Sequence, residues 1–220
     1  MDKHYDYDLI IFDLDGTLVD SAADIVATVQ HIIEKYGFEP KDDDFIRGCI
    51  GGGARNVLIK SLGEDKTALI DAEILPFFKD YYEENCAVYT KLYPGVTEVL
   101  EHYYTGGKPM ALATFKIRSA TEKILKTLGI DGYFEYVVTA DDVKNPKPHP
   151  ECIEKILEHY HLKPQQAVLV GDTKTDFMTG KNAGVDVCAV TYGYGDSDHL
   201  ASLAPKFMTD YITEIKERFL

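Results

Sequence analysis

The sequence predicts an α/β fold, a doubly wound (Rossmann-like) parallel sheet with an inserted helical domain. Five short apolar runs alternate with segments of helical spacing, at residues 9–12, 110–113, 136–138, 167–170 and 187–190. Continuous apolar runs of this length are typical of strands that are buried on both faces of a parallel sheet. Strands that alternate with helices in this way predict a sheet covered by helices on both faces.

The stretch between the first two strands predicts a helical insert. Residues 21–89 contain no strand-like run, and a structureless loop of that length is improbable in a compact domain. Ser21 is placed to cap a first helix with apolar residues at helical spacing, and Gly37 is placed to end it. Further helices are expected at residues 54–61 and 66–85, which together would form a small bundle over the core.

These boundaries divide the chain into two expected domains. We expect an α/β core at residues 1–19 and 91–220, and a helical cap domain at residues 20–90. The hinges of any cap motion are expected where the chain enters and leaves the insert, near Asp20 and Tyr93-Pro94.

The net charge of −14 argues against two classes of partner. Nucleic acids and anionic membranes both bind positive surfaces, and this chain carries 37 acidic residues against 23 lysines and arginines. We therefore expect a small-molecule partner, no nucleic acid and no membrane, and a monomer or homodimer. An acidic protein that binds an anionic small molecule must also supply positive charge locally, from a metal, lysines or helix N-termini.

The cysteines and the hydropathy pattern predict a cytoplasmic protein. The four cysteines are scattered and form no C-x-x-C pair, which predicts reduced thiols at positions 49, 86, 152 and 188. The first residues lack a basic stretch followed by a long apolar run, and no segment approaches ~20 uninterrupted apolar residues.

Polar residues follow the predicted strands, at the edge of the sheet where ligands of open α/β sheets collect. These residues are Asp13, Asp15, Thr114, Lys116, Lys147, Asp172 and Asp176. Because the carboxyl ends of parallel strands share one edge, we expect these side chains to converge on a single site.

Asp13 and Asp15 straddle the end of the first strand, where Gly16 permits a sharp turn. The pair can point into one pocket with two different roles. Taken alone, it could equally lie in a solvated loop or cap a helix, but the buried strand before it favours chemistry. Asp172 could likewise cap a helix that begins near Thr175.

Several carboxylates at one edge require a compensating cation. Oxygen ligands suit Mg²⁺, which keeps several waters and shares its coordination sphere with a substrate phosphate. Lys147 stands between Pro146 and Pro148, which restrict its backbone. Its charge would reduce the repulsion between a carboxylate and a phosphate, about 4 kcal/mol per charge pair at 4 Å and an effective dielectric of 20.

These motifs, in this order, resemble the haloacid dehalogenase superfamily in its phosphatase branch. The four signatures are Phe12-Asp13-Leu14-Asp15-Gly16-Thr17-Leu18, Thr114, Lys147 and Gly171-Asp172-Thr173-Lys174-Thr175-Asp176. The helical insert matches the helical cap of the phosphoglycolate phosphatase-like and β-phosphoglucomutase-like members. The presence of Asp15 favours a phosphate ester as substrate, because the dehalogenases that name the superfamily lack this acid.

The resemblance implies a phosphatase that works through an aspartyl-phosphate. Asp13 would be the nucleophile and Asp15 the acid and base, with Thr114 and Lys147 as the other catalytic residues. The resemblance also implies a Mg²⁺ ion, and its ligands would come from Asp13, the backbone carbonyl of Asp15, Asp172 and, near the metal, Asp176.

A glycine-rich turn in the cap, Ile50-Gly51-Gly52-Gly53-Ala54-Arg55, resembles the phosphoglycolate phosphatase pattern. The implied substrate contacts are Gly52, Arg55, Thr114, Phe115 and Lys116, with Arg55 on the substrate's carboxylate. The alternative is that the glycines only join two helices and that Arg55 is exposed. Phe115 stands where many relatives carry asparagine or serine, and its ring would change the shape of the pocket.

Two other functions are compatible with the same motifs. A sugar phosphomutase of the β-phosphoglucomutase type would return the phosphoryl group to its substrate instead of to water. A non-catalytic binding or regulatory protein could retain the fold, although the presence of both Asp13 and Asp15 favours an enzyme. The leading prediction is a phosphatase that acts on a small, phosphoglycolate-like metabolite.

Overall fold

The computed structural model describes residues 5–219, so the two ends of the expected core domain, residues 1–4 and 220, lie outside the described part. A six-stranded parallel sheet forms the core, in the order β5-β4-β1-β6-β7-β8. The strands are β1 (Leu9–Phe12), β4 (Met110–Ala113), β5 (Tyr136–Val138), β6 (Ala167–Gly171), β7 (Asp186–Val190) and β8 (Phe207–Thr209). The predicted α/β fold class and the five predicted strands are confirmed. The sequence does not predict β8, because Phe207–Thr209 offers only two apolar residues in succession, between Lys206 and Thr209.

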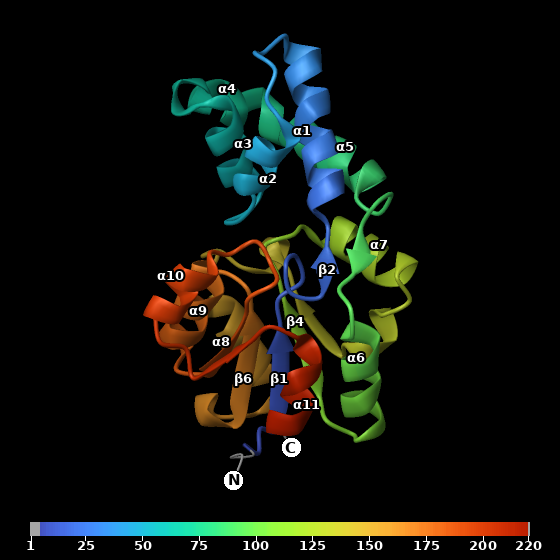
Figure 1. Ribbon diagram of the computed structural model, residues 1–220, viewed down its shortest axis with the longest axis vertical. Coiled ribbons are helices and arrows are strands. Elements are labelled where there is room, and N and C mark those ends of the chain that lie inside the picture. The colour runs from blue at the N-terminus through green and yellow to red at the C-terminus, as the bar shows by residue number, and fades with distance from the viewer. Residues whose placement is uncertain (1–4, 220) are drawn as a thin grey trace.

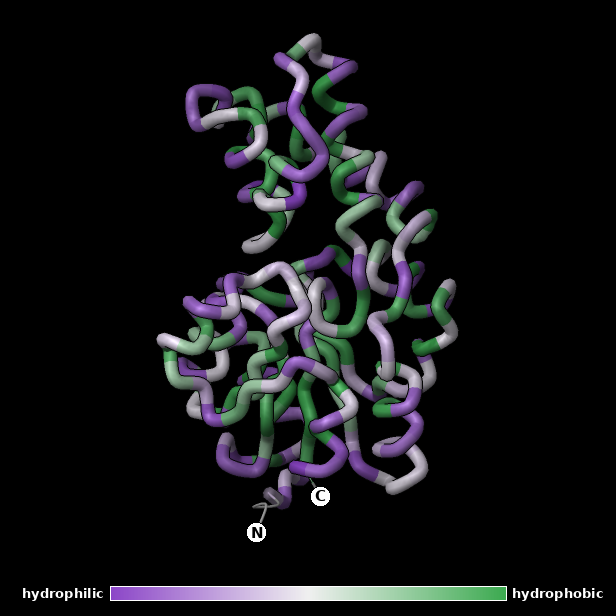
Figure 2. Tube along the Cα trace, viewed as in Figure 1, coloured by the Kyte–Doolittle hydropathy of each residue, from purple (hydrophilic) through white to green (hydrophobic). Residues whose placement is uncertain are grey.

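Helices cover both faces of this sheet, as its alternating pattern requires. Ile10 and Phe12 of β1 lie in one apolar cluster, while Leu9 and Ile11 lie in another on the opposite face. Figure 2 shows the strands as hydrophobic segments inside a more hydrophilic surround. The helices that follow the strands are α6 (Val96–Thr105), α7 (Arg118–Thr127), α8 (Glu151–Tyr160), α9 (Lys174–Ala183), α10 (Ser197–Ser202) and α11 (Ile215–Arg218).

A separate group of helices lies beyond the carboxyl ends of the strands (Figure 1). It consists of α1 (Ala22–Tyr36), α2 (Asp43–Gly48), α3 (Ala54–Leu62), α4 (Thr67–Leu69) and α5 (Leu75–Asn85), with a π-helical turn (Ile70–Ile74) joining the last two. The predicted helices of this region are therefore present. The division into a core at residues 1–19 and 91–220 and a cap at 20–90 stays a prediction.

Two short antiparallel strands connect the sheet to this helical group. They are β2 (Val19–Asp20) and β3 (Lys91–Leu92), so the chain enters and leaves the group side by side. The buried Asp24 carboxylate strengthens this junction by accepting backbone N–H bonds from Val88, Tyr89 and Thr90 at 2.9 to 3.1 Å.

Helix α1 begins and ends at the predicted residues, but one of the two signals works differently. Gly37 ends the helix in the left-handed conformation, with φ of 65°. Ser21 occupies the N-cap position, yet its hydroxyl does not cap the helix and instead donates to Asp15. The expected capping role of Ser21 is wrong, because the Asp15 carboxylate is the stronger acceptor within its reach.

No helix among residues 5–219 is long and apolar enough to span a membrane.

Candidate active site

The carboxyl ends of three neighbouring strands bring the predicted polar residues together. Asp13 follows β1, Thr114 follows β4 and Asp172 follows β6, and all three side chains are buried. Lys147 arrives on the loop between β5 and α8, and Asp176 lies in the first turn of α9. Residues that are more than 160 positions apart thus share one edge of the sheet.

Lys147 is a buried cation between two carboxylates. Its Nζ donates to Asp13 Oδ1 at 3.0 Å and to Asp176 Oδ1 at 2.7 Å. Burial alone would lower the pKa of the Lys147 ammonium, but the neighbouring charges of Asp13 and Asp176 raise it overall. Lys147 is therefore charged, and it fixes the relative positions of the two carboxylates.

Three carboxylates form a cluster that can hold a cation. Asp13, Asp172 and Asp176 each place an oxygen within 4.8 Å of the others. Burial raises the pKa of Asp13 well above its ordinary value against the opposing effect of Lys147, and burial together with the charge of Asp176 raises the pKa of Asp172 to about 7. The single ammonium of Lys147 cannot neutralise three carboxylates, and hard oxygen donors suit a small divalent cation. The residues present therefore fit such an ion.

Asp176 also has a structural role in its helix. Thr173 is the N-cap of α9, and its hydroxyl accepts the Asp176 backbone N–H while the Asp176 carboxylate accepts the Thr173 N–H at 3.1 Å. The possibility that Asp172 caps this helix is wrong, because Thr173 occupies that position. Asp172 instead accepts hydrogen bonds from the Thr17 hydroxyl at 3.1 Å and the Tyr194 N–H at 2.7 Å.

The Asp15 side chain lies outside the three-carboxylate cluster and has its own partners. Its Oδ1 forms an ion pair with Lys116 Nζ at 3.0 Å and accepts the Ser21 hydroxyl. Lys116 also donates to the hydroxyl of Tyr82 in α5, at 2.6 Å. Ligation of a metal by the Asp15 backbone carbonyl stays a prediction, as does a contact between Lys116 and substrate.

A glycine-rich loop that sequence reasoning missed closes over this site. Tyr192-Gly193-Tyr194-Gly195 follows β7, and added Cβ atoms at Gly193 and Gly195 would lie 2.3 and 1.9 Å from Asp172 atoms. Gly16 approaches the same carboxylate, and a Cβ there would lie 2.1 Å from Asp172 Oδ2. Glycine is required at these close contacts, and the alternating Tyr-Gly pattern after the strand was the signal that could have revealed them.

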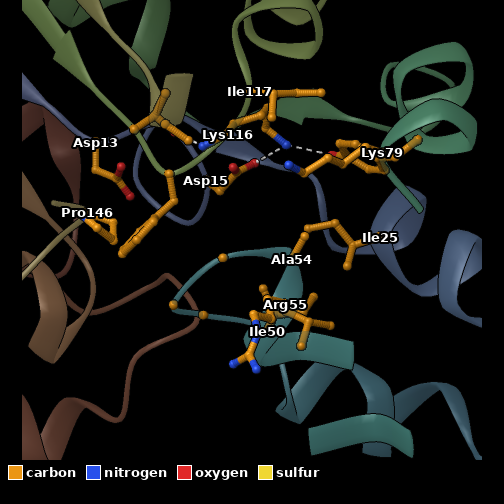
Figure 3. A pocket seen from close by; sticks show the side chains of 18 of the residues that line it. Asp13, Asp15, Ile25, Ile50, Ala54, Arg55, Lys79, Lys116, Ile117 and Pro146 are labelled. Atoms are coloured by element: carbon orange, nitrogen blue, oxygen red, sulfur yellow. Dashed lines mark hydrogen bonds and ion pairs between the residues drawn. The ribbon is translucent and has the colours of Figure 1, made fainter. Parts of the chain in front are cut away.

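The site opens into a cavity of about 530 Å³. Asp13, Asp15, Thr114 and Lys116 line it from the sheet edge, and the opposite wall is mostly apolar. That wall comes from the helical group, and its apolar side chains include Ile25, Ile50, Val57, Leu75 and Phe78. Figure 3 shows Asp13 and Asp15 facing this space, with Ile25, Ile50 and Ala54 across it. A phosphate ester could bind here with its body held between the two walls.

The glycine-rich turn before α3 meets the sheet edge at Phe115. A Cβ added to Gly53 would lie 3.5 Å from the Phe115 ring, so the two segments are in contact distance. Gly52 has φ of 74°, and the Asn56 side chain fastens the turn by donating to the Gly51 carbonyl at 2.7 Å. Gly52 and Phe115 both line the cavity, whereas their contact with substrate stays a prediction.

Arg55 lines the cavity but already has a partner. Its Nε and Nη2 donate to the two oxygens of Asp71 at 2.6 and 2.8 Å, and the ion pair is about half exposed. Binding of a substrate carboxylate by Arg55 therefore requires competition with Asp71. Lys79 is a further cation that the helical group contributes to the cavity wall (Figure 3).

Comparisons with known proteins found a family model, relatives and a solved structure that match most of the chain. Residues 10–190 match the family model described as haloacid dehalogenase-like hydrolase. A phosphoglycolate phosphatase of Vibrio parahaemolyticus is 32% identical over 218 residues, covering 96% of both chains, and that of Aquifex aeolicus is 38% identical, covering 84% of this chain and 85% of its own. A crystal structure of a predicted phosphoglycolate phosphatase from Haemophilus somnus superposes with a TM-score of 0.85 at 29% identity, covering 96% of this chain and 97% of its own.

Replacing Gly16 by alanine should damage the cluster as well as the backbone. Gly16 and Gly37 both have positive φ, at 85° and 65°, but nothing lies within 4 Å of a Cβ at Gly37. We expect Gly37→Ala to lower the free energy of unfolding by about 1–2 kcal/mol, the cost of a left-handed alanine, and Gly16→Ala to lower it further. Only Gly16→Ala should lose the stabilisation by divalent cations in thermal melts. Equal cation responses in the two variants would contradict the assigned position of Asp172.

The raised pKa of Asp172 predicts a specific pH dependence of stability in metal-free protein. An unfolded aspartate has a pKa of ~3.9, whereas that of folded Asp172 is about 7. Below pH 4 both states hold the proton. As the pH rises from 4 to 7 only the unfolded state releases it, so the wild type loses stability across this window. We expect Asp172→Asn to become more stable than the wild type across this window in denaturant titrations with a chelator. A difference that does not change with pH would disprove the assignment.

Proposed function

Because the chain belongs to the haloacid dehalogenase-like hydrolase family and is a phosphatase, we propose that it hydrolyses a small phosphate ester through an aspartyl-phosphate on Asp13, with Mg²⁺ as cofactor. The observation that carries this proposal is the position of Asp13. Its carboxylate is buried beside the Lys147 ammonium, faces the cavity and belongs to the three-carboxylate cluster.

In the first half-reaction, an Asp13 oxygen attacks phosphorus and the bond from phosphorus to the ester oxygen breaks. Asp15, protonated at this stage, gives its proton to the departing oxygen, and the alcohol leaves. In the second, Asp15 takes a proton from water as the water oxygen attacks phosphorus. The bond from Asp13 to phosphorus then breaks, which releases inorganic phosphate and regenerates both carboxyl groups.

The neighbouring residues fit supporting roles in these steps. Thr114 Oγ1 accepts the backbone N–H of Lys116 at 3.2 Å, so its own hydrogen is free to donate to a phosphoryl oxygen. Lys147 would offset negative charge between Asp13 and the phosphate. Asp13, Asp172 and the Asp15 carbonyl would hold Mg²⁺, with Asp176 close by, and the bound ion would supply the positive charge that the phosphate and carboxylates require together.

We propose phosphoglycolate, or a similarly small ester with a second anionic group, as the substrate. The support comes from the two relatives that carry this activity in their names and from Arg55 and Lys79, two cations that the helical group contributes to the cavity wall. Gly52 and Phe115 would shape the space around the ester body. We place the reaction in the cytoplasm, where the free thiols of all four cysteines would stay reduced.

Asp13→Asn should abolish phosphatase activity while leaving the fold intact. Loss of the nucleophile should reduce kcat with Mg²⁺ at least ~10³-fold, measured as phosphate release from a metabolite panel and from p-nitrophenyl phosphate. Asp8→Asn is the matched control, since Asp8 is an exposed aspartate at the other end of β1. Asp15→Asn should slow turnover ~10²–10⁴-fold and accumulate phosphoenzyme, detected by intact mass. Undiminished turnover in Asp13→Asn would sink the proposed mechanism.

The role of Arg55 can be separated from its ion pair with Asp71. If Arg55 binds the substrate's second anion, Arg55→Ala should raise KM for phosphoglycolate about tenfold or more, as expected for a lost charge-assisted contact. Asp71→Ala should leave KM unchanged or lower it, because it frees the guanidinium. Equal rises of KM in the two variants would show that the ion pair only stabilises the helical group.

A further inference from the structure

Lys116 is a buried cation that the proposed reaction does not use. Its side chain is 5% exposed, and its Nζ lies 3.0 Å from Asp15 Oδ1 and 2.6 Å from the Tyr82 hydroxyl. The same Nζ lies 4.4 Å from the centre of the Tyr82 ring. Burying an ammonium is unfavourable unless it is paired and hydrogen-bonded, so Asp15 and Tyr82 together make this position possible.

The three residues come from separate parts of the chain. Asp15 belongs to the turn after β1, Lys116 to the loop after β4, and Tyr82 to α5 of the helical group. Figure 3 shows the bond between Lys116 and Asp15 at the edge of the cavity. Tyr82 is buried and stacks on Phe78, with ring centroids 5.5 Å apart, which holds its hydroxyl in place. Asp15 is therefore linked through one lysine to a helix on the other side of the cavity.

The contacts of Asp15 distinguish its two oxygens. Both the Lys116 ammonium and the Ser21 hydroxyl bind Oδ1. Among residues 5–219, no hydrogen bond is donated to Oδ2. An oxygen held by two donors has little freedom to exchange a proton, whereas its unbound partner can carry one.

We propose that Lys116 and Tyr82 are positioning residues that hold Oδ1 of Asp15, so that Oδ2 faces the reacting ester and carries the proton in both half-reactions. This inference rests on the proposed role of Asp15 as acid and base. Because Tyr82 belongs to α5, the orientation of the acid depends on where that helix lies. Enclosure of a substrate beneath the helical group would thus also align the proton donor.

Tyr82→Phe tests this inference, because it removes one hydroxyl and keeps the packed ring. An alkyl phosphate such as phosphoglycolate has a poor leaving group that needs protonation, whereas p-nitrophenolate leaves with little help. For Tyr82→Phe we expect kcat/KM to fall about tenfold with the alkyl ester and to stay within about twofold with p-nitrophenyl phosphate. The ratio kcat/KM is the right measure, since it reports only steps up to formation of the aspartyl-phosphate.

Tyr81→Phe is the control, since the neighbouring Tyr81 stacks on His31 at 4.3 Å, away from Asp15, and both kcat/KM values should match the wild type. Lys116→Met should show the same selective loss, with a larger fall for the alkyl ester. Equal losses with both esters, or no loss in Tyr82→Phe at an unchanged melting temperature, would overturn the inference. Neither result bears on the proposed function, which is disproved only if Asp13→Asn stays active.

Discussion

The structure depends on the crowding of buried carboxylates at the carboxyl ends of β1 and β6. Asp13, Asp172 and Asp176 meet there, and each lies where water cannot fully solvate its charge. Lys147 relieves part of this repulsion by bonding to two of them. Burial, and after it the remaining excess of negative charge, raises the pKa values of Asp13 and Asp172, and that excess also creates affinity for a cation. The cluster therefore lowers the stability of the cation-free protein and raises its affinity for the cation.

Such a cluster is possible only because the surrounding backbone comes unusually close. Asp172 is fully buried between Gly16 and the loop that holds Gly193 and Gly195, where no side chain would fit. The backbone N–H of Tyr194 and the hydroxyl of Thr17 then supply donors to its carboxylate. Glycine at these positions therefore allows a close approach, in which main-chain atoms replace water around the Asp172 carboxylate.

The sequence allowed the sheet and the cluster to be predicted, because both follow from local patterns. Each buried strand is a continuous apolar run, and parallel topology makes the residues after the strands neighbours whatever their separation in the chain. The surroundings of Asp15 could not be predicted in this way. Ser21, Lys116 and Tyr82 reach it from three segments, and their proximity depends on how α1 and α5 pack over the sheet. Ser21 shows the limit clearly, since its local pattern indicates a helix cap while its hydroxyl binds a carboxylate.

Asp13 and Asp15, the two carboxylates of the first motif, therefore have different surroundings although they lie only two positions apart. Asp13 lies with the cluster and the Lys147 ammonium at the sheet edge, whereas Asp15 is paired with Lys116, which in turn donates to Tyr82 of the helical group. A movement of that group would leave the first almost undisturbed and would change the second. The apolar wall opposite them belongs to the same group, and so does the turn at Gly53 that meets Phe115. In the proposed mechanism, recognition of the ester body and alignment of Asp15 thus depend on the same helices, so both would respond together when a substrate occupies the cavity.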